Sequence, residues 1–232
     1  MSAEVVLISD PAVVAIPVVE CGEPLANVRG CPGVQLDTRR SETDGSYALL
    51  RTGVLERLAR AQQALPGGLH LLVVEGYRPP ELQSVYFTEY SDQLRAQHPD
   101  WPPAVVTRMA SRYIAPPDAA PHTAGAAVDL TLCGADGVEV DMGTAVNATP
   151  EDSDGACYFA APRVDGPARA NRDLLGRALG GAGLVNYPTE WWHWSYGDRY
   201  WAHVTGARHA RYAVLGSGSS PEAGIDSRTV ER

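Results

Sequence analysis

The stretch PHTAGAAVDLTL, residues 121–132, decides the fold of this chain. If its second half is a strand, the side chains alternate between two faces. One face is apolar and belongs on a core: Val128, Leu130 and Leu132. Asp129 lies on the other face, which is unusual unless that face lines a site. His122, seven residues earlier, would point away from Asp129 on a continuous strand. We therefore expect His122 in a turn before the strand, which Gly125 makes possible.

A second stretch, TEWWHW at residues 189–194, adds another histidine with an acid three residues before it. After Pro188 we expect Glu190 in irregular backbone, followed by a strand that carries His193. Two imidazoles and one carboxylate match a catalytic zinc, which takes three N/O protein ligands and leaves a fourth position for water. The second carboxylate is then free to take a proton from that water.

Each of these residues has an ordinary alternative interpretation. A lone histidine is usually a satisfied core or surface residue, and a lone aspartate at a strand end is usually a turn former. Two histidines and two acids in apolar and aromatic surroundings argue for a site, because buried charges are normally paired or bound to metal. The other histidines have no such context, and we expect them to be non-ligands: His70, His98, His203 and His209.

The remaining pattern alternates helices and strands without a linker. Residues 47–65 predict an amphipathic helix, and residues 69–75 predict a buried strand. Further helices are expected at 80–97, 102–113 and 166–179, and further strands at 184–187 and 191–196. Residues 1–40 suggest short strands and turns, and 141–163 a long loop of the kind that is often functional. We expect one domain over 1–215 and a disordered Gly/Ser/charged tail at 216–232.

Composition restricts partners and compartment. The net charge of −9 and the lack of a Lys/Arg cluster argue against a nucleic-acid partner. No apolar run reaches the length of a membrane span, and the first residues do not form a convincing signal peptide, so we expect a cytoplasmic protein. The four cysteines lack CxxC spacing, which argues against a thiolate zinc site. Cys21 and Cys31 could pair, although reduced thiols are the ordinary state in the cytoplasm.

Three motifs together resemble a known family. They are EGYRP at 75–79, H-x6-DLTL at 122–132 and EWWH at 190–193. In order and spacing they are similar to the zinc-dependent D-alanyl-D-alanine dipeptidases, the VanX-like branch of peptidase family M15, over residues 45–200. The resemblance implies an α+β fold of the Hedgehog/DD-peptidase type, in which a mainly antiparallel sheet carries the zinc site and helices pack against it. It also implies a small D-amino-acid dipeptide, D-Ala-D-Ala or a close analogue, as substrate.

The resemblance implies roles position by position. One zinc ion per chain would be held by His122, Asp129 and His193, with Glu190 as general base. Arg78 would stabilise the tetrahedral intermediate, although a structural salt bridge at a strand end is its ordinary alternative. Substrate contacts are expected from three further residues: Tyr77, Asn147 and Trp192. Core packing is the ordinary alternative for Trp192, as it is for the neighbouring Trp191 and Trp194.

Two departures from the family pattern bear on the substrate. Ala120 stands where the family often has serine, and Asn147 stands where it often has an aspartate that helps to hold the substrate ammonium. An amide cannot supply the charge of a carboxylate. The same loop offers other acids that could compensate: Glu151, Asp152 and Asp154. Two alternatives therefore stay open, the same hydrolysis of another small peptide or amide, and a zinc-stabilised binding module without catalysis. Glu190 argues against the second, because a structural zinc needs no free base. The sequence does not determine the oligomeric state.

Overall fold

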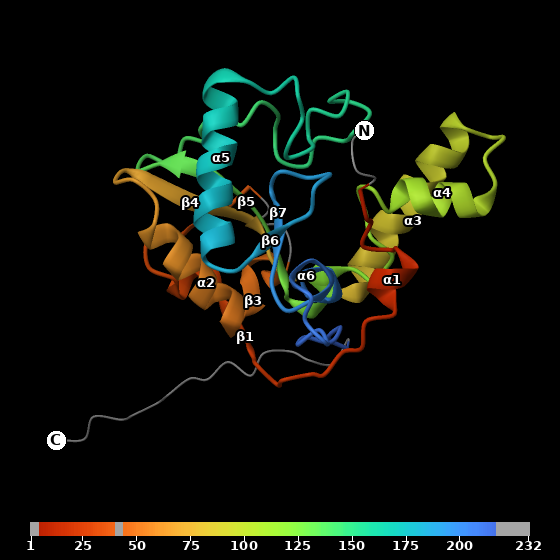
Figure 1. Cartoon of the computed structure of the whole chain (residues 1–232), viewed down its shortest axis with the longest axis horizontal. Helices are drawn as coiled ribbons and strands as arrows, with labels where there is room; N and C mark the ends of the chain where they lie inside the picture. Colours follow the sequence, from red (N-terminus) through yellow and green to blue (C-terminus); the bar gives the residue numbers. More distant parts are fainter. Residues whose placement is uncertain (1–4, 40–43, 217–232) are drawn as a thin grey trace.

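The structure of the protein is a computed structural model that describes residues 5–39 and 44–216. Its helices are α1 (Pro11–Val14), α2 (Thr52–Gln63), α3 (Pro80–Gln97), α4 (Pro103–Ala110), α5 (Gly166–Gly181) and α6 (Arg199–Thr205) (Figure 1). Its strands are β1 (Leu25–Asn27), β2 (Gln35–Leu36), β3 (Leu49–Arg51), β4 (Leu69–Glu75), β5 (Ala127–Gly134), β6 (Val185–Asn186) and β7 (His193–Ser195). The single-domain boundary at 215 stays a prediction, and residues 217–232 of the expected tail lie outside the described residues.

The main sheet has five strands in the order β2-β4-β5-β7-β6. The pair β2–β4 is parallel, and the pairs β4–β5, β5–β7 and β6–β7 are antiparallel. A separate antiparallel pair joins β1 to β3. The predicted α+β class with a mainly antiparallel sheet is confirmed.

One face of this sheet is the core. The predicted apolar face of β5 is fully buried and packs with α2 and α5, which lie together along the sheet (Figure 1). Buried leucines from both helices complete the cluster: Leu58, Leu175 and Leu179. Burying one such side chain contributes about 1.5–3 kcal/mol, so this face supplies much of the stability of the fold. The opposite face of β5 is left to carry Asp129.

The pairing of β4 with β5 contains an irregularity that matters for the site. Val73 is opposite Leu130, but the next pair is Glu75 with Asp129, so Val74 is an extra residue on β4. An extra residue of this kind shifts the side chains that follow to the other face. Glu75 therefore lies beside Asp129 on the face away from the core.

Helices α3 and α4 form a pair of their own at one end of the molecule, away from α2 and α5 (Figure 1). Their contact is a small apolar cluster built from Tyr90, Leu94, Val106 and Ala110. Both helices begin with proline at their first turn, where the missing N–H costs nothing. This pair forms a wall beside the sheet rather than a cover over its core.

Several predicted boundaries differ from the structure. The helix expected from residue 47 begins at Thr52, because Tyr47 and Leu49 instead accept backbone hydrogen bonds from Gly76 and Tyr77. The helix expected over 102–113 ends at Ala110. Helix α6 was not predicted, although Asp198 caps its N-terminus by accepting from the Trp201 N–H, and Gly206 ends it in the left-handed conformation.

Within the described ranges, no helix combines the length and the apolar character needed to cross a bilayer. All four cysteines are unpaired; Cys21 is exposed and Cys31 is buried.

Gly76 provides a test of the close approach between β4 and the 47–49 segment. A Cβ at this position would lie 2.4 Å from the Leu49 carbonyl oxygen and 3.0 Å from that of Tyr47. Because both obstacles are backbone, Gly76→Ala should lower the free energy of unfolding by about 1–3 kcal/mol or more. Gly67→Ala, before the same strand and with nothing within 4 Å, is the matched control and should change it by less than about 1 kcal/mol. Equal urea midpoints for the two variants would contradict this packing.

Candidate metal centre

His122 is presented by a tight turn, as the sequence predicts. It lies in a short 3-10 helix, Pro121–Ala124, which ends at Gly125 with a φ of 64°. The buried Arg51 holds this turn, since its Nε donates to the Ala124 carbonyl at 2.8 Å. His122 Nδ1 lies 2.7 Å from the Gly76 carbonyl oxygen. A carbonyl can only accept, so Nδ1 carries the hydrogen and Nε2 directs its lone pair into the site.

Asp129 and His193 are brought together by strand register. They are Cα partners in the β5–β7 pair, so both side chains project from the same face. Glu75 is the partner of Asp129 on the other side. The sheet thus places Glu75, Asp129 and His193 in one row across β4, β5 and β7.

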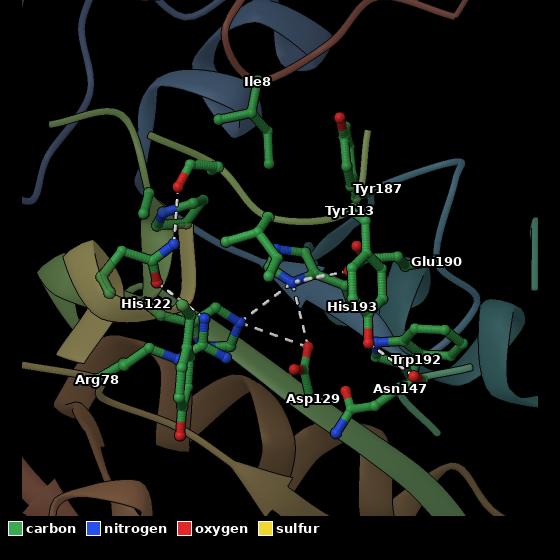
Figure 2. Close-up of a pocket in the computed structure, with 16 residues that line it drawn as sticks. Ile8, Arg78, Tyr113, His122, Asp129, Asn147, Tyr187, Glu190, Trp192 and His193 are labelled. Atoms are coloured by element: carbon green, nitrogen blue, oxygen red, sulfur yellow. Dashed lines mark hydrogen bonds and ion pairs between the residues drawn. The ribbon is translucent and has the colours of Figure 1, made fainter. Parts of the chain in front are cut away.

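The three predicted ligand residues converge on one point (Figure 2). His122 Nε2 lies 3.2 Å from His193 Nδ1 and 3.4 Å from Asp129 Oδ1, and His193 Nδ1 lies 3.1 Å from Asp129 Oδ1. Bonds of about 2.0–2.1 Å to a tetrahedral zinc imply ligand–ligand distances of about 3.3–3.4 Å. The donor set and the triangle it forms therefore fit a tetrahedral divalent metal with one position open.

The cluster is deeply buried. All three residues are at most 5% exposed. Burial alone would raise the pKa of Asp129, but the His122 and His193 imidazoles outweigh it and hold the pKa below its usual value. Burial also lowers the pKa of His193, against the attraction of Asp129. An ionised aspartate with neutral imidazoles is the protonation state that a metal requires.

Glu190 lies three residues before His193, the first residue of β7, and next to the cluster. Its Oε2 is 3.7 Å from His193 Nδ1, and its Oε1 has no hydrogen-bond partner among the described residues. Burial raises the pKa of Glu190 well above its usual value, the charge of Asp129 raises it further, and Arg78 opposes both. A buried carboxyl group with a free oxygen beside a metal cluster is placed to accept and return a proton.

Arg78 lines the cavity and also forms the salt bridge expected as its ordinary alternative, so its role at the reacting carbonyl stays a prediction. Its Nε and one terminal nitrogen contact the two oxygens of Glu75 at 2.7 and 2.8 Å. Its other terminal nitrogen donates to Gln83 Oε1 at 2.8 Å. The Tyr86 ring lies 5.0 Å from the guanidinium carbon. Arg78 is therefore held firmly at the edge of the cavity.

The cavity over the cluster is small, about 220 Å³, against roughly 300–1,000 Å³ for sites that bind drug-sized molecules. Of the residues predicted to contact substrate, Asn147 and Trp192 line it (Figure 2). Tyr77 is buried and is not among the lining residues, so its position gives no support to a substrate contact. Trp192 also belongs to the main core, together with Trp191 and Trp194.

Several lining residues escaped prediction from the sequence: Ile8, Gln83, Tyr86, Tyr113 and Tyr187. Gln83 and Tyr86 follow the EGYRP motif by one and two helical turns, a signal that could have found them. The others reach the cavity only through tertiary packing. Ile8 comes from the N-terminal segment, so that segment contributes to the lining of the cavity (Figure 2).

None of the acids suggested as compensation for Asn147 is among the residues that line the cavity. Glu151 accepts a hydrogen bond from the Tyr90 hydroxyl, and Asp154 pairs with Arg163. Among the residues that the structure describes, the carboxylates lining the cavity are those of Asp129 and Glu190. Asn147 itself has a left-handed φ of 65°, and its carbonyl accepts from the Tyr113 hydroxyl at 2.6 Å.

Known proteins with similar sequences come from one family. The family model described as D-ala-D-ala dipeptidase (Peptidase_M15) matches residues 38–214. A D-alanyl-D-alanine dipeptidase of Synechocystis sp. is 31% identical over 223 residues, covering 84% of this chain and 90% of that protein. One from Escherichia coli is 30% identical over 146 residues, covering 62% and 65%. Among solved structures, the LdcB LD-carboxypeptidase has a TM-score of 0.44 and 20% identity, covering 80% of this chain and 73% of that one.

Asp129→Asn tests the metal site. The amide keeps the shape of the carboxylate but loses its charge, so affinity for zinc should fall by more than the roughly 10–100-fold that loss of an outer partner costs. Asp37→Asn removes another buried carboxylate, which follows β2 and binds Arg39 Nε instead of the cluster, and it should leave affinity within about twofold. Competition titration with a chromophoric chelator measures both. Equal affinities would contradict Asp129 as a ligand.

Proposed function

This chain belongs to the M15 peptidase family of D-Ala-D-Ala dipeptidases and is a metallopeptidase, and from that membership we propose that it hydrolyses D-Ala-D-Ala or a close D-amino-acid dipeptide with one zinc ion. The observation that carries the proposal is the convergence of three ligand atoms with the Glu190 carboxyl group beside them. The small cavity supports a substrate of dipeptide size.

His122, Asp129 and His193 would hold the zinc through Nε2, Oδ1 and Nδ1, the atoms that face one another. When bound, the ion would act as a Lewis acid on the scissile carbonyl and lower the pKa of a water molecule. The hydrogen bond from His122 Nδ1 to Gly76 keeps the ligand nitrogen unprotonated, which is the usual purpose of such an outer contact.

Glu190 is the proposed general base. It takes a proton from the attacking water as the new C–O bond forms, and returns it to the leaving amine as the peptide C–N bond breaks. The free Oε1 supports this role, since a carboxylate already bound to donors would be a weaker base. The raised pKa also suits a group that must hold the proton between the two steps.

Arg78 is proposed to donate to the carbonyl oxygen as negative charge develops on it. Arginine stays protonated in any such environment, and burial in a water-poor cavity strengthens its effect on an anion. Its pairing with Glu75 keeps the guanidinium in place before substrate arrives, so no reorganisation is needed during the reaction.

Glu190→Gln separates catalysis from metal binding. The amide cannot accept the water proton, so kcat for D-Ala-D-Ala should fall by about 10²–10⁴-fold. Bound zinc, measured by elemental analysis, should stay unchanged, because Glu190 is not a proposed ligand. D-alanine release is followed by a coupled oxidase assay.

Glu151→Gln is the matched control, because it removes a nearby carboxylate that does not line the cavity. Its kcat should stay within about twofold of the wild type. Retained turnover in Glu190→Gln would contradict the proposed base. A wild-type protein that binds zinc but releases no D-alanine would reject the named substrate. A wild-type protein that binds zinc and hydrolyses no dipeptide or amide at all would favour the zinc-stabilised binding module.

A second candidate function keeps this chemistry and changes the substrate to another small peptide or amide. The observation that favours it is Asn147 at the cavity wall, with no further lining carboxylate among the described residues to match an ammonium. An N-acylated dipeptide, which has no ammonium, would not need one. A dipeptide library screen that includes N-acetyl-D-Ala-D-Ala distinguishes the two candidates. The cytoplasmic location stays a prediction.

Asn147→Asp tests the role of this position. Aspartate tolerates the left-handed backbone as asparagine does, so the variant should fold. A charge-assisted contact to the substrate ammonium is expected to gain about 1 kcal/mol, or about fivefold in kcat/KM for free D-Ala-D-Ala. N-acetyl-D-Ala-D-Ala is the control substrate and should not gain. An equal change in kcat/KM for both substrates would show that residue 147 does not contact the amino terminus of the substrate.

A further inference from the structure

The guanidinium of Arg78 is held by two different side chains. Of its five N–H donors, two are taken by Glu75, one from Nε and one from a terminal nitrogen, and a third is taken by Gln83. Two donors remain, one on each terminal nitrogen, and no partner among the described residues takes them. Glu75 and Gln83 thus leave a defined part of the guanidinium for a ligand in the cavity.

Gln83 is fixed at both ends of its side-chain amide. It comes from the first turn of α3, is 1% exposed and lines the cavity. Its Oε1 accepts from Arg78, and its Nε2 donates to the Ala115 carbonyl at 2.7 Å. A buried amide with both halves bonded has one orientation, because turning it over would place donor against donor and acceptor against acceptor.

The same contacts join Arg78 to the segment that carries the first ligand. The Arg78 backbone N–H donates to the His122 carbonyl at 3.2 Å, and Ala115 lies on the loop that leads into the His122 turn. One helical turn beyond Gln83, the Tyr86 ring faces the guanidinium at 5.0 Å. The first two turns of α3 therefore fix the angle of Arg78 relative to the metal cluster.

We propose that Gln83 is a positioning residue, which aims the two remaining Arg78 donors at the oxygen of the scissile carbonyl. The proposal rests on the proposed function, because it assumes that Arg78 meets developing charge there. Glu75 neutralises the guanidinium and holds one side of it; Gln83 holds the other side and prevents the group from tilting about the salt bridge. Loss of this orientation of the Arg78 guanidinium should lower the rate of the chemical step and leave binding of the substrate in its ground state nearly unchanged.

Gln83→Met is the direct test, because methionine fills a similar volume and removes both hydrogen bonds. Its kcat should fall about tenfold with KM changed less than about twofold, since an interaction made mainly in the transition state is weakened. Ser91→Ala is the matched control: Ser91 is buried in the same helix, and its hydroxyl has no partner among the described residues. It should keep kcat within about twofold. A Gln83→Met enzyme with wild-type kcat overturns the proposal.

A double-mutant cycle separates positioning from general stability. Arg78→Lys keeps the positive charge beside Glu75 but lacks the planar fork that Gln83 orients. In that background Gln83→Met should lower kcat by less than about twofold, whereas a merely structural role would give the same tenfold loss again. Gln83→Glu keeps an oxygen acceptor for Arg78 and, when ionised, loses the donor to Ala115. It should retain kcat within about threefold, and a tenfold loss in the folded protein counts against the proposal.

One readout does not depend on turnover. Crystal structures of zinc-loaded wild type and Gln83→Met, or Gln83→Glu if the first variant does not fold, report the orientation of Arg78 directly. A rotated guanidinium in Gln83→Met, and a retained one in Gln83→Glu, support the proposal. An unmoved guanidinium in Gln83→Met, or a displaced one in Gln83→Glu, overturns it. If zinc-loaded wild type releases no D-alanine, the proposed function fails, while these structures still decide whether Gln83 holds Arg78.

Discussion

The register of three neighbouring strands is the constraint on which the site depends. β4, β5 and β7 place Glu75, Asp129 and His193 in one row on the face away from the core. A slip of one residue in either pairing would send a carboxylate or an imidazole into the apolar core, so the register is strongly specified. Because that row is fixed, Glu75 can anchor Arg78, and Gly76 beside it can orient His122.

Much of this arrangement is predictable because its signals are local. Strand β4, the start of α3 and the apolar face of β5 follow from glycine and proline positions and from periodicity within a few residues. The need to turn at Gly125 follows from spacing alone, since His122 and Asp129 cannot share a face of one continuous strand. The ligand residues are predictable as a set, because buried histidines and acids require a common partner.

What could not be predicted depends on contacts between distant segments. The extra residue at Val74 decides which face Glu75 occupies, and nothing within β4 indicates it. Residues 49–51 have helical neighbours and an apolar pattern, yet they are extended because β1 supplies a pairing partner. Likewise, a glutamine in a helix is usually exposed, and Gln83 is buried only because α3 packs against Arg78 and Ala115.

The charges around the cavity bear differently on the hydrolytic chemistry and on the recognition of a substrate. Burial and the charge of Asp129 raise the pKa of Glu190, and Arg78, which is paired with Glu75, opposes them only in part. A divalent cation held by the cluster would offset the negative charges of Asp129 and of ionised Glu190, and the cavity would then be close to neutral. A neutral cavity suits the uncharged peptide group at its centre. The charged ends of a substrate must be matched by the walls, where Asn147 and the tyrosines offer dipoles instead of ions. The strands of the sheet therefore position the groups proposed for hydrolysis, while the choice of substrate depends on the loop that carries Asn147.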